Sequence, residues 1–162
     1  MTGLAMRKIT PCLWFDDKAE EAATFYTSIF KNSRILGLTR YGDGTIRPKG
    51  TVMTVTFCLD GQEFMALNGG PLFKFTEAVS LIVNCKTQKE VDTMWAKLSA
   101  GGAEVQCGWL KDKFGLSWQI VPVVLAKMLR DKNEVKRQRM MTALFQMKKL
   151  ETAGLKRAFA GR

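Results

Sequence analysis

The sequence predicts an α+β fold built from two copies of a strand–helix–strand–strand–strand (βαβββ) module, the second one shortened, with a helical tail at the end. An internal repeat is the first observation. Residues 8–30 and 79–100 follow the same plan at a fixed offset of 70 residues, because in each an apolar strand leads into an amphipathic helix. Phe25 then corresponds to Trp95. Repetition of this length indicates a domain assembled from two small structural units with a pocket between them.

The first module carries clear signals at the ends of its helix and hairpin. Asp17, with Glu20 three residues later, resembles a capping box at the helix start, and Lys31-Asn32 ends the helix. Asp60-Gly61 between two apolar segments predicts a tight hairpin. The predicted elements are a strand at 8–15, a helix at 17–30, a strand at 33–40, a Gly-rich loop at 41–50, and strands at 51–59 and 62–67.

The second module repeats this order over fewer residues. Thr87 and Glu90 form a capping box, and Gly101-Gly102 stops the helix that follows. Pro122 marks the change to helical segments. The predicted elements are a strand at 78–85, a helix from 87, strands at 104–110 and 116–121 around a turn at 112–115, and helices at 123–130, 134–147 and 151–160.

Histidine is absent from the whole chain. Its absence excludes histidine-based acid–base catalysis, a Ser-His-Asp triad and every His-ligated metal site. The four cysteines, Cys12, Cys58, Cys85 and Cys107, show no CxxC spacing, so we interpret them as reduced, buried thiols, with a reactive Cys107 as the alternative. No GxGxxG or P-loop motif follows a strand, so no nucleotide cofactor is predicted.

Charge and hydropathy limit the partners that we expect. The formal net charge is +10, and residues 127–162 carry eleven Lys or Arg against three Asp or Glu. Such a balance is able to attract nucleic acid or another anionic surface. We favour a solvated face of terminal helices, because the charges are not interleaved with aromatic residues that would stack on bases, and nucleic acid is not the expected partner. No apolar run suits a membrane span or a signal peptide, so no membrane contact is expected and the expected location is cytoplasmic.

Five segments carry a family resemblance, namely residues 9–15, 21–26, 61–71, 99–102 and 107–122. The most specific parts read Ala-Leu-Asn-Gly-Gly-Pro at 66–71 and Cys-Gly-Trp-Leu-Lys-Asp-Lys-Phe-Gly-Leu-Ser-Trp-Gln-Ile-Val-Pro at 107–122. Together they resemble the vicinal oxygen chelate superfamily, which includes glyoxalase I, bleomycin-resistance proteins and extradiol dioxygenases. Within it the chain resembles the PhnB-like group, whose domain is often labelled 3-demethylubiquinone-9 3-methyltransferase.

This resemblance implies a domain organisation and a type of site. It implies one domain over residues 1–162, with module one at 7–70, module two at 77–122 and the helical tail at 123–162. It also implies a curved mixed sheet around a central cavity, and a homodimer. Metal-dependent members place His or Glu ligands at four positions, which fall here near Thr10-Pro11, Phe64–Ala66, Ala78–Ser80 and at Gln119. None of these is a good ligand for a divalent cation, so we expect no metal and no cofactor.

Six residues are assigned to the cavity by sequence: Trp14, Asn68, Phe73, Trp109, Trp118 and Gln119. Trp109 and Trp118 lie on adjacent predicted strands and are interpreted as aromatic walls, while Asn68 and Gln119 supply neutral hydrogen-bonding groups. The alternative is that the tryptophans belong to the core or to a dimer interface and that Asn68 is a turn residue. The acid–base candidates in the matching segments are Glu63, Lys111 and Asp112; we expect Glu63 to be exposed, and we interpret the other two as a structural turn.

Two functions from different classes remain open. The favoured one is a glyoxalase/bleomycin-resistance-like protein that binds a small, planar or partly aromatic molecule in the cavity between the modules, without the standard metal site and without metal-dependent catalysis. The alternative is an enzyme of the superfamily, a lyase, isomerase or methyltransferase, acting on a small metabolite. Gly69-Gly70 does not match the Gly-rich loop of enzymes that use S-adenosylmethionine. A weaker alternative is contact of the basic C-terminal helices with anions or nucleic acid.

Overall fold

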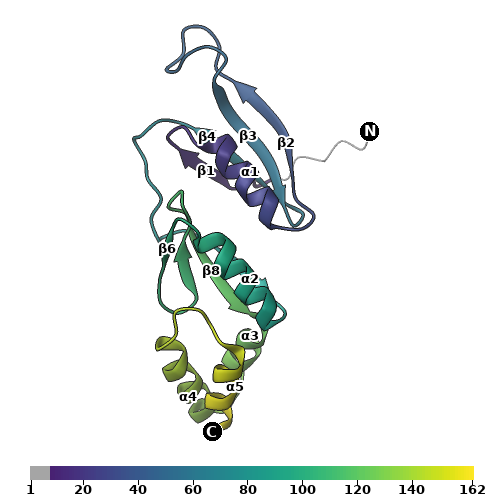
Figure 1. Cartoon of the computed structure of the whole chain (residues 1–162), viewed down its shortest axis with the longest axis vertical. Helices are drawn as coiled ribbons and strands as arrows, with labels where there is room; N and C mark the ends of the chain where they lie inside the picture. The colour runs from purple at the N-terminus through teal and green to yellow at the C-terminus, as the bar shows by residue number, and fades with distance from the viewer. Residues whose placement is uncertain (1–7) are drawn as a thin grey trace. The chain divides into compact units, whose positions relative to one another are not determined.

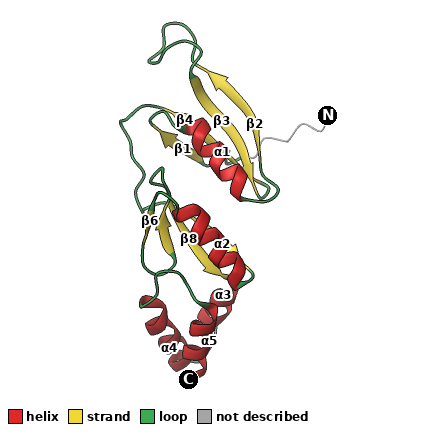
Figure 2. Cartoon of the chain, in the orientation of Figure 1, coloured by secondary structure: helices red, strands yellow, loops and turns green. Residues whose placement is uncertain are grey.

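The computed structural model describes residues 8–162, which divide into two units, one ending at Lys74 and one beginning at Phe75 (Figures 1 and 2). The first unit contains β1 (Cys12–Phe15), α1 (Ala19–Ile29), β2 (Arg34–Arg40), β3 (Val52–Leu59) and β4 (Gln62–Asn68). The second contains β5 (Ser80–Cys85), α2 (Gln88–Ser99), β6 (Ala103–Glu104), β7 (Trp109–Lys111), β8 (Ser117–Pro122), α3 (Val123–Leu129), α4 (Glu134–Phe145) and α5 (Thr152–Ala160). The predicted βαβββ repeat and the helical tail are confirmed.

Each unit builds its own four-stranded mixed sheet with the same topology. The strand order is β1-β4-β3-β2 in the first sheet and β5-β8-β7-β6 in the second. The first strand of each module runs parallel to the last one, and the remaining neighbours are antiparallel. The shortening predicted for the second module lies in β6 and β7, which have two and three residues.

The first unit packs α1 against one face of its sheet (Figure 2). Tyr26 of α1 is fully buried and stacks on Phe57 of β3 at 6.3 Å between ring centroids. Leu13 and Phe15 of β1 are buried on the same side. Because side chains alternate along a strand, Trp14 points to the opposite face.

The two helices begin in different ways. At α1 the predicted cap by Asp17 is wrong, since the N-cap position is Lys18 and its side chain makes no capping bond. The free N–H of Ala19 instead donates to Oδ1 of Asn68, 2.8 Å away at the end of β4. At α2 the prediction is confirmed, because Oγ1 of Thr87 accepts a hydrogen bond from the Glu90 N–H.

The second unit packs α2 against the face of its sheet that carries Leu110, Trp118 and Ile120, all three buried. The strand predicted at 104–110 is divided into β6 and β7. Cys107, with a φ of 62°, and Gly108, with a φ of 82°, turn the chain between them. Left-handed backbone of this kind cannot continue a strand.

The helical extension, residues 123–162, has a small apolar core of its own. Its buried members are Leu125, Met128, Met140, Leu144, Leu150 and Leu155, and Cys107 and Val121 of the sheet pack against them. The segment before α5 pairs with the turn between β6 and β7, where the N–H of Cys107 donates to Met147 O and that of Gly108 to Lys148 O. The extension therefore belongs to the second unit and is not a detached tail.

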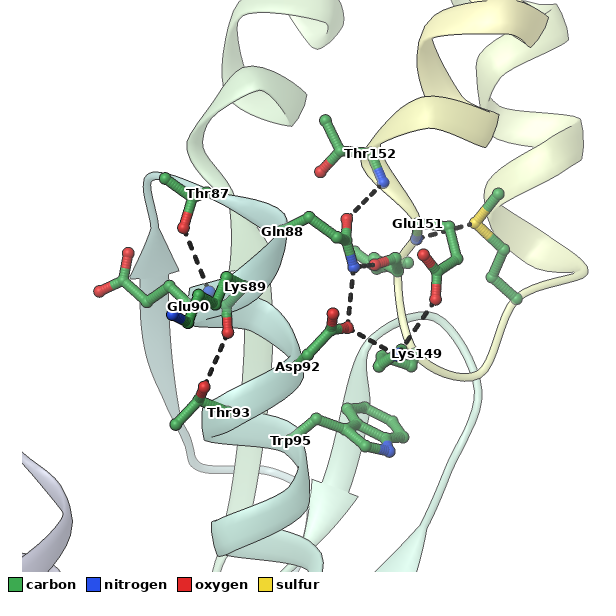
Figure 3. Close-up of polar contacts among 12 residues, drawn as sticks. Thr87, Gln88, Lys89, Glu90, Asp92, Thr93, Trp95, Lys149, Glu151 and Thr152 are labelled. Atoms are coloured by element: carbon green, nitrogen blue, oxygen red, sulfur yellow. Dashed lines mark hydrogen bonds and ion pairs between the residues drawn. The ribbon is translucent and has the colours of Figure 1, made fainter.

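A polar junction joins the extension to the start of α2 (Figure 3). The side-chain amide of Gln88 donates to Leu150 O at 3.1 Å and accepts from the Thr152 N–H at 2.8 Å. Lys149 forms ion pairs with Asp92 at 2.6 Å and Glu151 at 3.2 Å.

None of the helices within residues 8–162 combines the length and hydropathy that crossing a bilayer requires.

Candidate functional site

Trp14 and Phe73 form an aromatic pair on the face of the first sheet that α1 does not cover. Their ring centroids lie 4.9 Å apart in an edge-to-face arrangement of 76°. The indole N–H of Trp14 donates to Gly70 O at 2.8 Å. The indole also lies directly over Gly69, where a Cβ would come within 2.3 Å of Trp14 Cζ2. Two glycines thus fix the ring, while Phe73 remains 58% exposed.

The same face carries one carboxylate from its strands, that of Glu63. Glu63 pairs with Cys58 across β3 and β4 and is only 9% exposed, so the prediction that it is exposed is wrong. The polar neighbours on β3 are hydroxyl groups, since Thr54 and Thr56 alternate onto this face. Oγ1 of Thr54 and Oγ1 of Thr39 share a hydrogen bond of 2.5 Å. The face therefore combines aromatic, hydroxyl and thiol groups with a single acid and, on β2, with the basic residue Arg34 opposite Cys58.

Asn68 lies apart from the Trp14–Phe73 pair and has a structural role, because its side chain makes hydrogen bonds within the first unit. Its Oδ1 caps α1, its Nδ2 donates to Val52 O at 3.1 Å, and its own carbonyl accepts from the Tyr41 hydroxyl at 2.5 Å. Asn68 also lines an open pocket of about 460 Å³ in the first unit. The other lining residues are Asp17, Glu20, Arg47, Pro48, Thr51 and Val52.

This pocket has mixed charge, which sequence reasoning missed. The Arg47 guanidinium donates to the Asp16 carboxylate at 2.7 Å and also to the Asp16 carbonyl. The two residues are 31 positions apart, and Arg47 belongs to a Gly-rich loop, so no local pattern joins them. The pocket is charged, whereas the groups beside Trp14 are aromatic or neutral.

Gln119 and Trp109 lie side by side on the face of the second sheet that α2 does not cover. They are directly opposite each other on β8 and β7. Nε2 of Gln119 donates to Oγ of Ser80 at 2.9 Å across β5 and β8. Ile82 on β5 faces the same way and is 56% exposed. Of the six predicted residues, Gln119 and Trp109 are therefore brought together in the second unit. Their neighbour Ser80 belongs to the Ala78–Ser80 segment, which the family resemblance placed, like Gln119, at a ligand position.

Trp118 faces the other way. It precedes Gln119 on β8, so it points toward α2, where it is 2% exposed. Its indole N–H donates to Oδ2 of Asp112 at 2.8 Å, while Oδ1 of Asp112 accepts from the N–H groups of Phe114 and Leu116. Trp109 and Trp118 thus lie on adjacent strands but not on one face, because neighbouring positions alternate. Asp112 is the structural turn residue that its position predicts.

Lys111 lies on the Gln119 face and forms an ion pair with Glu77 at 2.5 Å. The hydrogen bond from Lys111, helped by its charge, lowers the pKa of the Glu77 carboxyl. Glu77 is therefore ionised at neutral pH and is a poor proton donor.

The donors on these faces do not fit a divalent cation. Gln119 and Ser80 are neutral, and Glu63 is one acid where a metal needs several charged or imidazole ligands. Within residues 8–162 no three His, Cys, Asp or Glu side chains come together at metal-binding spacing.

Comparison with known proteins gives a family and a fold. A family model described as 3-demethylubiquinone-9 3-methyltransferase matches residues 7–121. The PhnB protein from Bacillus cereus is 43% identical, with 72% of this chain and 99% of that chain covered and a TM-score of 0.66. No curated protein is similar enough to this chain to count as a match.

Two more distant structures share the fold alone. A protein from Pseudomonas aeruginosa is 19% identical, covers 72% of this chain and 98% of its own, and has a TM-score of 0.59. The fosfomycin resistance protein FosX from Listeria monocytogenes, solved with Mn(II) and a sulfate ion, is 17% identical, covers 80% of this chain and 97% of its own, and has a TM-score of 0.52. The predicted two-module fold is confirmed.

Proposed function

This chain belongs to the 3-demethylubiquinone-9 3-methyltransferase (PhnB-like) family. From that premise we propose that it binds a small, planar molecule on the face of the second sheet that α2 does not cover. The observation that carries this is the Gln119–Ser80 hydrogen bond beside Trp109, which presents an aromatic ring and a neutral amide on one face. Sites for small molecules are mostly apolar and carry a few well-placed polar groups.

The first unit carries a separate aromatic surface on the corresponding face of its own sheet. Trp14 is held by Gly70 O and by contact with Gly69, so its ring needs little ordering when a ligand arrives. An aromatic pair contributes about 0.5–1.5 kcal/mol beyond its buried area. Phe73 is exposed enough to add a second ring contact.

The second unit supports recognition of a neutral polar group. The Gln119 amide has two donor hydrogens and an acceptor oxygen, and the bond to Ser80 uses one hydrogen. The bond also fixes the orientation of the amide. A carbonyl, hydroxyl or ring nitrogen on the ligand is matched to such a group.

An enzyme acting on a small metabolite is the second candidate, and Glu63 favours it. A mostly buried carboxylate on the same face as Trp14 is a candidate general base. We further propose that the chain works as a homodimer, for which light scattering should give twice the mass of one chain.

Binding is tested with a panel of neutral aromatic and planar compounds, followed by tryptophan fluorescence and thermal shift. For any compound that binds, Gln119→Leu should weaken affinity about 5- to 150-fold, because removing one hydrogen-bond partner costs about 1–3 kcal/mol. Gln106→Leu, at an exposed position of the same unit, is the matched control and should leave affinity unchanged. Equal effects of the two variants, or a panel without any binder, would count against this function.

Turnover separates the two candidates. The bound compound is incubated with protein and followed by mass spectrometry. A constant mass supports binding alone, whereas product that disappears in Glu63→Gln establishes the catalytic alternative.

A further inference from the structure

The helical extension carries nearly all of the net charge. Residues 123–162 hold eleven Lys or Arg against three Asp or Glu, while residues 1–122 hold fourteen against twelve. The extension therefore contributes +8 of the formal +10 in about a quarter of the length. The family match ends at residue 121, just before the extension begins at residue 123. The PhnB protein from Bacillus cereus aligns over 99% of its length with 72% of this chain, so the remainder has no counterpart in it.

The extension uses its apolar side chains internally and leaves its basic ones outside. Leu155 of α5 is fully buried, and Phe159 packs on the same apolar cluster. The exposed basic residues are Lys127, Arg130, Lys132, Arg139, Lys148, Lys156, Arg157 and Arg162. Lys149 is paired with Asp92 and Glu151, so the extension has few acids left to offset the others.

Contacts between α4 and α5 hold part of this charge together. The Arg139 guanidinium on α4 donates to the carbonyls of Ala158 and Phe159, both at 3.2 Å, at the end of α5. Nζ of Lys136, one turn before Arg139, lies 5.6 Å from the centroid of the Phe159 ring. Two fixed cations thus border the end of α5, where Arg157 lies in the last turn and Arg162 follows the Gly161 cap.

We infer that this basic surface of α4 and α5 binds the phosphate backbone of a double-stranded nucleic acid, independently of the small-molecule function. Duplex phosphates lie at close, regular spacing and are neutralised by Lys and Arg without base contacts. Stacking aromatic residues, whose absence argued against nucleic acid at the level of sequence, are needed for single strands and not for a duplex.

The same observations disfavour a lipid bilayer as the anionic partner. A helix that lies in a membrane surface needs a free apolar face, and α5 has buried its own. On α4 the exposed apolar side chains are Val135 and Phe145. They lie ten residues apart, or about 15 Å along the helix, with basic and polar residues between them.

The test measures binding of a fluorescent 20-base-pair DNA duplex by anisotropy at several salt concentrations. Affinity should fall steeply as salt rises. The variant Lys156→Gln/Arg157→Gln/Arg162→Gln should reduce the slope of log K against log salt by about 3, since each phosphate contact contributes about 0.9. The matched control Lys31→Gln/Arg34→Gln/Lys74→Gln removes the same charge from exposed positions of the first unit. It should change the slope by less than about 0.9, the contribution of one phosphate contact.

Three outcomes overturn the inference. They are no duplex binding at low salt, equal slopes for the two triple variants, and tighter binding to vesicles of phosphatidylserine than to the duplex at the same salt. Circular dichroism of each variant verifies that the fold is intact. Unchanged small-molecule binding in the α5 variant separates this surface from the function proposed above.

Discussion

Gln88 provides the sharpest test of how the helical extension is attached. Its side-chain amide makes three hydrogen bonds, to Asp92 Oδ1 and Leu150 O at 3.1 Å each and from the Thr152 N–H at 2.8 Å (Figure 3). Gln88→Met keeps the length and shape of the side chain but removes all three. Each bond contributes about 1 kcal/mol, and the half-buried site admits some water to replace them. We therefore expect the extension to be held to α2 less strongly by about 2–3 kcal/mol.

Hydrogen exchange locates this loss in the molecule. The Thr152 amide should exchange about 30- to 150-fold faster in Gln88→Met, since each 1.4 kcal/mol is a factor of ten. Lys89→Met is the control, because Lys89 is the next residue of α2 and is exposed. If Thr152 keeps its protection in Gln88→Met, or if both variants lose it equally, then Gln88 does not hold the extension.

Three further predictions concern packing, thiol reactivity and pH. Gly69→Ala should destabilise the first unit by about 1–3 kcal/mol in urea, because the new methyl group would lie 2.3 Å from Trp14. At pH 8 a thiol reagent should label exposed Cys12 first and spare Cys85, since burial raises the pKa of the Cys85 thiol to about 11. Hydrogen bonds from a lysine and a glutamine lower the pKa of Asp92, so the ionised carboxylate stabilises the fold at any pH above the ordinary aspartate pKa. This stabilisation should fade as the pH falls through the lowered pKa, and the unfolding temperature should fall with it.

Each of these has a control. Gly42→Ala introduces the same methyl group where nothing lies within 4 Å, so a loss of stability equal to that of Gly69→Ala would show that the indole contact is unimportant. For the thiols, all four cysteines should react once the protein is unfolded, and fast native labelling of buried Cys58 would contradict the burial. For the pH effect, Asp92→Asn should flatten the acid limb, and an unchanged limb would assign it to other acids.

Much of the fold follows from local sequence signals. The Thr87 cap and the Asp60-Gly61 hairpin depend on neighbours in the chain, so local pattern predicted them. The repeat at an offset of 70 residues is visible when the sequence is compared with itself. The cap of α1 could not be found in this way. Asn68, which holds the Ala19 N–H, is 49 residues away, and its role exists only once β4 lies beside β1.

The candidate site shows the same division. Trp118 and its neighbour Gln119 were both assigned to the cavity, although adjacent residues of a strand point to opposite faces. In the structure Gln119 lies beside Trp109, while the Trp118 indole points to Asp112 in the core. A shift of one residue reverses the face of a side chain, so sites on short strands such as β7 are the hardest to predict.

The attachment of the extension has a consequence for the order in which the chain folds during synthesis. The first unit contains its whole sheet and helix before Lys74, so it can complete its core while the rest is still being made. The second unit waits longer, because Gln88 finds its partners 62 and 64 residues later, at Leu150 and Thr152. Until those residues leave the ribosome, the apolar cluster against which Cys107 and Val121 pack lacks Leu150 and Leu155. A nascent chain that pauses shortly after Pro122 should therefore contain a folded first unit and an incompletely folded second unit, whose exposed apolar side chains chaperones still bind.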